Sequence, residues 1–125
     1  LKTHSISDIN KLVKDILFGN VTKDDLNSDD YNLIYGNEGI FWVRALSGDN
    51  PDCGKALKTI QLINNGEEEG GIVVGHTPQT NINSVCSGRV WLTDNGMSQA
   101  FGERDDDSRI QVLEIRSGKN PRVIY

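Results

Sequence analysis

A short β-branched run that ends in glycine and histidine constrains the fold of this chain more than any other feature. Ile72-Val73-Val74 has the length of a single strand, and Gly75-His76-Thr77-Pro78 follows it directly. A continuous run of this kind is typical of a strand buried on both faces of a sheet. Upstream, Asp52 is a candidate N-cap for a helix through Ile63 that stops at Asn65-Gly66. The order of helix, loop, buried strand and glycine predicts an α/β fold.

The first third of the chain predicts helices. Ser5 and Asp8 have the spacing of a capping box, and apolar residues then recur at helical spacing until Gly19. Thr22 with Asp25 predicts a second, shorter helical turn. The polar run over residues 27–30 predicts a loop.

The remaining segments predict turns, loops and strands. Residues 36–39 predict a turn, 40–46 form a compact apolar segment with Arg44 as its one charge, and 47–51 predict a loop. Strands are expected within 89–94, 110–115 and 122–125, with a glycine-containing loop over 95–102 and a polar connection over 103–108.

Composition narrows the class of protein. The chain has 125 residues, of which 36% are hydrophobic and 25% charged, so we expect one domain or part of one. A net charge of −5 without a basic stripe argues against a nucleic-acid partner. No apolar run approaches the roughly 20 residues of a membrane span. Cys53 and Cys86 lack CxxC spacing, which favours two free thiols and an intracellular location. Because the chain opens on Leu1 and helical signals begin almost at once, we expect part of a longer protein.

His76 is the main candidate for chemistry. It follows a predicted buried strand, and the C-terminal ends of strands in α/β folds commonly carry ligand-binding groups. Imidazole is a common metal ligand, but a histidine satisfied by ordinary hydrogen bonds has the same local pattern. From the residues alone both interpretations stay open, because metal sites require clustered ligands.

The wider pattern resembles a known family. The block from Ile72 to Gln79, then Ile82, Cys86, Arg89-Val90-Trp91 and residues 94–102, resembles the C-terminal part of calcineurin-like metallophosphoesterases. Within that superfamily it is most similar to the Shewanella-like serine/threonine protein phosphatases. Residues 111–115 and 121–124 resemble the closing strands, 5–10 the helix after the fourth motif, and 41–44 the apolar-Trp-x-Arg segment.

The resemblance implies a fold, a reaction and a site. The fold would be the C-terminal half of a two-sheet β-sandwich flanked by helices, with residues 1–125 forming part of one metallophosphoesterase domain. The reaction would be hydrolysis of phosphomonoesters, in phosphoproteins or small phosphoesters, by a hydroxide that bridges two divalent ions (Mn, Fe or Zn). His76 would be a ligand of one ion and Arg44 a phosphate contact, which could equally be an ordinary ion-paired arginine. Gly75, Thr77 and Asp94 would shape the pocket.

Departures from the family pattern leave alternatives open. Pro78 stands where phosphodiesterase-like branches place a second histidine, which favours the phosphatase pattern, whereas Leu92 and Asn95 differ from common family residues. The motifs Asp-x-His, Gly-Asp-x-x-Asp-Arg, Gly-Asn-His-Glu and His-Gly-Gly have no counterpart here. We therefore expect this chain alone to be inactive and poorly stable. A dinucleoside-polyphosphate hydrolase and a non-catalytic scaffold domain are the alternative functions.

Overall fold

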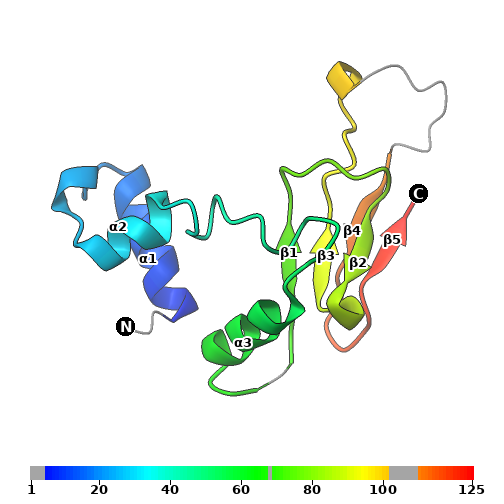
Figure 1. Cartoon of the computed structure of the whole chain (residues 1–125), viewed down its shortest axis with the longest axis horizontal. Coiled ribbons are helices and arrows are strands. Elements are labelled where there is room, and N and C mark those ends of the chain that lie inside the picture. Colours follow the sequence, from blue (N-terminus) through cyan, green and yellow to red (C-terminus); the bar gives the residue numbers. More distant parts are fainter. Residues whose placement is uncertain (1–4, 68, 102–109) are drawn as a thin grey trace.

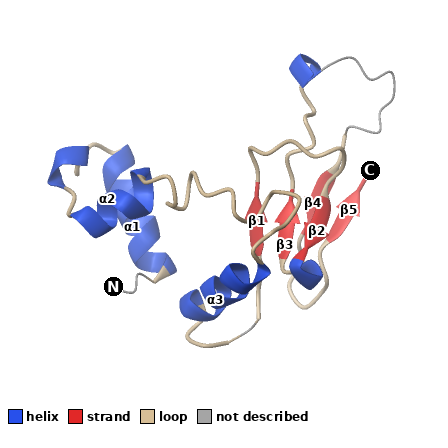
Figure 2. Cartoon of the chain, in the orientation of Figure 1, coloured by secondary structure: helices blue, strands red, loops and turns tan. Residues whose placement is uncertain are grey.

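The structure is a computed structural model, and it describes residues 5–67, 69–101 and 110–125. Three α-helices, several short 3₁₀ turns and two small sheets make up the described part, so the α/β prediction is confirmed (Figures 1 and 2). In chain order the elements are α1 (Ile6–Leu17), η1 (Lys23–Asp25), α2 (Ser28–Tyr35), α3 (Cys53–Ile63), β1 (Ile72–Val74), β2 (Asn83–Val85), η2 (Cys86–Gly88), β3 (Val90–Leu92), η3 (Gln99–Phe101), β4 (Val112–Glu114) and β5 (Arg122–Ile124).

The start and end of α1 confirm the predicted helix. The amide of Asp8 donates to Ser5 Oγ at 3.1 Å, and the amide of Ser5 donates to Asp8 Oδ2 at 3.0 Å. These reciprocal bonds satisfy N–H groups that have no partner within the helix. Gly19 follows the C-cap with φ +73°, a conformation that glycine adopts without steric cost.

The segment after α1 confirms one prediction and corrects another. Thr22 and Asp25 cap η1 as expected, with the Thr22 amide donating to Asp25 at 2.8 Å. Residues 27–30, predicted as a loop, instead begin α2: the amide of Asp30 donates to the side chain of Asn27 at 2.9 Å. The loop prediction is wrong because short polar and acidic residues are also favoured at an N-cap and in the first helical turn.

The region that positions the candidate site is α3 with the three-stranded sheet. Asp52 caps α3, as predicted, by accepting from the amide of Lys55 at 2.9 Å. β3 lies in the centre of the sheet, parallel to β1 and antiparallel to β2. Strands within 89–94, 110–115 and 122–125 are confirmed as β3, β4 and β5, and β4 pairs antiparallel with β5.

The core lies between α3 and one face of this sheet. Ala56 of α3 packs with Val90 and Leu92, beside residues of β1 and β2. Val73 points to the opposite face and is 49% exposed, so the prediction that β1 is buried on both faces is wrong. Successive side chains of a strand alternate between faces, and α3 covers the face of Ile72 and Val74.

A buried glutamine connects the two sheets. Gln111, just before β4, is 2% exposed and accepts a hydrogen bond from the Ile82 amide at 2.7 Å with its Oε1. Its Nε2 donates to Asn81 Oδ1 at 2.7 Å. The polar connection predicted over 103–108 lies outside the described residues.

Cys53 and Cys86 form a disulfide, which corrects the expectation of two free thiols. The bond joins the first residue of α3 to the first residue of η2. Sequence spacing could not reveal the pair, because the two residues meet only after α3 packs on the sheet. None of the described helices is long and apolar enough to cross a membrane.

Candidate functional site

The site begins at the C-terminal ends of β1 and β3. Because the two strands are parallel, the residues that follow them meet at one edge of the sheet. The amide of Thr93 donates to the Val74 carbonyl at 3.0 Å, and the amide of Gln79 donates to the Asp94 carbonyl at 2.7 Å. The loop that carries His76 is therefore hydrogen-bonded to the loop that carries Asp94.

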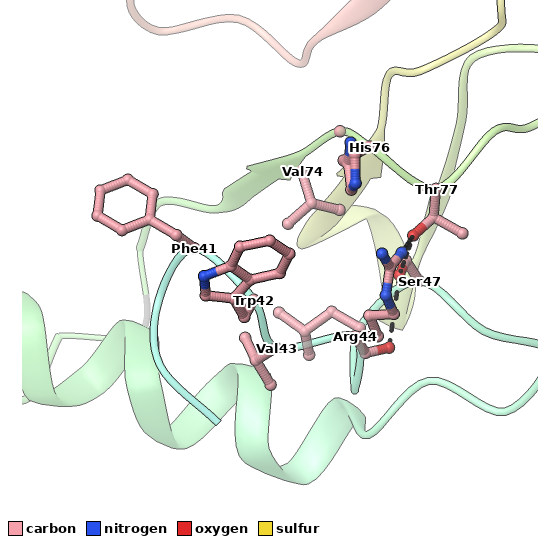
Figure 3. A pocket seen from close by; sticks show the side chains of 10 residues that line it. Phe41, Trp42, Val43, Arg44, Ser47, Val74, His76 and Thr77 are labelled. Carbon is pink, nitrogen blue, oxygen red and sulfur yellow. Dashed lines mark hydrogen bonds between the residues drawn. The ribbon is translucent and has the colours of Figure 1, made fainter. Parts of the chain in front are cut away.

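Arg44 reaches this edge from a distant part of the sequence. Its Nη1 donates to Thr77 Oγ1 at 3.0 Å, across 33 positions of the chain (Figure 3). Ser47 Oγ lies 3.0 Å from the same Thr77 oxygen. These contacts attach the segment that precedes α3 to the loop after β1.

A small depression lies where the two segments meet. It measures about 30 Å³ and is lined by Phe41, Trp42, Val43, Arg44, Leu46, Ser47, Val74, Gly75, His76 and Thr77 (Figure 3). This is far below the roughly 300 Å³ of a pocket that encloses a small molecule. A ligand would therefore lie across the depression. Phe41 and Trp42 at its border are 59% and 56% exposed.

The backbone of His76 is in the left-handed region, with φ +65°. For a residue with a side chain this conformation costs on the order of 1 kcal/mol or more. His76 is also exposed, so core packing does not explain the strain. Strained residues of this kind cluster at functional sites.

Potential metal ligands do not cluster in the part of the chain that the structure describes. Within residues 5–67, 69–101 and 110–125, no three histidine, cysteine, aspartate or glutamate side chains come together as a metal-binding group. The exposed imidazole of His76 fits the role of a single ligand. Two ions need several protein ligands, so the described residues fit only part of a two-metal centre.

The predicted site residues separate into two groups. Arg44, Gly75, His76 and Thr77 line one depression, although Arg44 is far from the others in sequence. Asp94 lies at the same sheet edge but outside that lining, and its Oδ1 accepts from the Gly96 amide at 3.2 Å. This side-chain contact lies within its own loop, whereas its carbonyl bonds the loop of His76 through Gln79.

Sequence reasoning missed Ser47 and the two aromatic residues at the border. The sequence predicts a loop at Ser47, yet this residue is only 9% exposed and contacts Thr77. A serine beside Gly48-Asp49-Asn50 carries the signal of an ordinary loop. Nothing in its neighbours along the chain could have indicated a contact 30 positions away.

The chain is similar to a viral protein. An uncharacterized protein of Acanthamoeba polyphaga mimivirus is 34% identical over an alignment of 105 residues, which covers 75% of this chain. The chain spans 38% of that relative's length. No protein-family model and no solved structure matches the chain.

Proposed function

We propose that this chain is the C-terminal portion of a metal-dependent phosphatase that hydrolyses phosphomonoesters, with phosphoserine and phosphothreonine in proteins as substrates. One observation supports the proposal above all others: Arg44 donates to Thr77, the neighbour of His76, at 3.0 Å. The candidate phosphate contact, Arg44, and the candidate metal ligand, His76, thus line one depression. The sequence resemblance named the same residues.

Each residue would contribute by its own chemistry. The Arg44 guanidinium uses Nη1 on Thr77 and has Nε and Nη2 besides, which match the spacing of two phosphate oxygens. His76 would supply one imidazole nitrogen to a divalent ion, with Gly75 leaving room beside it. Two such ions (Mn, Fe or Zn) would supply water activation and charge neutralisation when bound. Their other ligands would come from elsewhere in the protein.

The finer fold assignment is part of this proposal. The two small sheets, connected through Gln111, would be the C-terminal half of a β-sandwich, and residues 1–125 part of a single domain. An intracellular location was expected from two free thiols, but the disulfide is the form that cysteines take in oxidising surroundings. Trapping thiols with an alkylating reagent at cell lysis would decide between the two locations.

The full-length protein provides the test. We expect metal analysis to find two Mn, Fe or Zn ions per chain, and His76→Ala to lower both metal content and phosphatase activity toward phosphopeptides. Arg44→Lys keeps the charge but removes the planar fork, so activity should fall by on the order of tenfold or more. Arg116→Lys, the same change at an exposed position two residues after the end of β4, is the matched control.

The outcomes separate the alternatives. Two bound ions with activity on dinucleoside polyphosphates, and none on phosphopeptides, would replace the protein-phosphatase proposal with the nucleotide hydrolase. A full-length protein that binds no metal would favour the other alternative, a non-catalytic scaffold domain.

A further inference from the structure

We infer that Ser47 and Thr77 are positioning residues, which hold the guanidinium of Arg44 beside His76 through a closed ring of hydrogen bonds. The contribution of this ring to phosphate binding rests on the proposed function, but the ring itself does not. Its members are Arg44 Nη1, Thr77 Oγ1, Ser47 Oγ and the Arg44 carbonyl oxygen.

The chemistry of the donors fixes the direction of every bond in the ring. A guanidinium can only donate, so Thr77 Oγ1 accepts from Arg44 Nη1 at 3.0 Å. A carbonyl can only accept, so Ser47 Oγ donates its one proton to the Arg44 carbonyl at 3.4 Å. The remaining contact, 3.0 Å between the two hydroxyls, then has Thr77 as its donor. Each hydroxyl donates once and accepts once, and the ring closes.

Burial makes the Ser47 hydroxyl costly to leave without partners. Ser47 is 9% exposed, whereas Gly48, Asp49 and Asn50 directly after it are exposed. A buried hydroxyl without hydrogen bonds would destabilise the fold, so this conformation of residues 44–47 depends on the ring. The Ser47 amide also donates to the Arg44 carbonyl at 3.2 Å, which shapes the same turn.

The ring defines where the guanidinium points. Arg44 is exposed and belongs to a segment without regular secondary structure, so its long side chain would otherwise sample many rotamers. The bond to Thr77 selects an orientation toward the loop of His76. Binding a phosphate then costs less side-chain entropy, which is the advantage of a preorganised site.

The test uses the full-length protein labelled with ¹⁵N. Thr77→Val keeps the shape of the side chain and removes the hydroxyl, whereas Thr77→Ser keeps the hydroxyl. We expect the Nη protons of Arg44 to exchange with water roughly tenfold or more faster in Thr77→Val than in the wild type, as for one lost hydrogen bond to a charged group. In Ser47→Ala, which removes the partner of Thr77, they should also exchange faster than in the wild type. Thr77→Ser should retain the wild-type rate. A merely structural threonine would alter the melting temperature without this difference at Arg44.

If the Nη protons of Arg44 exchange at the same rate in the wild type, Thr77→Val and Ser47→Ala, the proposed ring of hydrogen bonds does not hold the guanidinium. A titration with inorganic phosphate on the same samples tests the proposed function separately. If the ring is present and phosphate leaves the Arg44 signals unchanged, the phosphate-binding role fails and the positioning of Arg44 stands.

Discussion

Cys53 at the start of α3 is bonded to Cys86 at the start of η2, and their Cα atoms lie 5.2 Å apart. The bond encloses the strand and loop that carry His76 and Thr77, together with β2. It also fixes the N-terminus of α3, where the Asp52 amide donates to the Ala45 carbonyl at 2.8 Å, next to Arg44. One covalent link therefore restrains both segments that form the candidate site.

Breaking this disulfide should destabilise the chain. The cysteines are 33 positions apart, and a closed loop of this length restricts the unfolded chain by about 3 to 4 kcal/mol. We expect dithiothreitol to lower the wild-type melting temperature. The double variant Cys53→Ala/Cys86→Ala should have a similarly low melting temperature that no longer responds to the reductant. A wild-type protein that melts at one temperature with and without the reductant would contradict the bond.

Removing the N-cap of α3, Asp52, should destabilise the chain less than breaking the disulfide. Asp52→Ala removes the oxygen that accepts from the Lys55 amide at 2.9 Å, so we expect a loss of about 1 kcal/mol in the free energy of unfolding. Asp52→Asn keeps an oxygen in the same place and should lose much less. Urea denaturation of the three proteins measures the difference, and equal losses in both variants would show that the carboxylate acts by its charge alone.

Local signals explain which elements could be predicted. The capping box of Ser5 and Asp8 and the cap at Asp52 involve residues within one helical turn, so the sequence contains the whole interaction. β2 has no such signal, because Asn83-Ser84-Val85 does not alternate between polar and apolar residues. It becomes a strand because its backbone pairs antiparallel with the free edge of β3, where Ser84 lies opposite Trp91.

The site was predictable only in part, for the same reason. The family resemblance indicates His76 and Arg44, and the structure brings them to one depression. No sequence signal indicates Ser47, because its role depends on Thr77, which is distant in sequence and adjacent only after folding. The disulfide is a second example: the pairing of Cys53 with Cys86 depends on how α3 packs against the sheet.

Two valines on neighbouring strands provide a matched test of the core. Val90 is 0% exposed and packs beneath α3, whereas Val73 is 49% exposed on the other face. Val90→Ala should lower the free energy of unfolding by about 2 kcal/mol or more, from lost burial and a residual cavity. Val73→Ala should lower it by well under half as much. Chemical denaturation measures both changes in the free energy of unfolding. If the two changes are comparable, Val73 must be covered by other residues in solution, as Val90 is.

His76 should respond unusually to replacement by glycine. Its φ of +65° strains any residue with a Cβ, and glycine adopts this conformation freely. We therefore expect His76→Gly to be about 1 kcal/mol more stable than His76→Ala. Thermal melts of the two variants measure this difference directly. A His76→Ala protein as stable as His76→Gly would mean that the left-handed backbone is not maintained in solution.

The β4–β5 hairpin should depend on pH through Glu114. Its carboxylate accepts from Arg122 and Arg116, and the hydrogen bond from Arg122, more than that from Arg116, lowers the pKa of Glu114 from its usual 4.5. Because the pKa is lower in the folded state, the stabilisation is present above pH 4.5 and is lost as the pH falls through the folded-state value. Glu114→Gln should therefore melt below the wild type at pH 7, and the gap should close toward pH 3.

Salt and a second glutamate serve as controls for this prediction. The two arginine side chains are 53% and 64% exposed, so 1 M NaCl should shrink the gap at pH 7 by screening. Glu67→Gln, at an exposed position after α3, should leave the melting temperature close to that of the wild type at pH 7. At pH 3 the carboxyl is protonated and no longer forms the ion pairs. If the difference in melting temperature between Glu114→Gln and the wild type is the same at pH 3 as at pH 7, the substitution acts through packing.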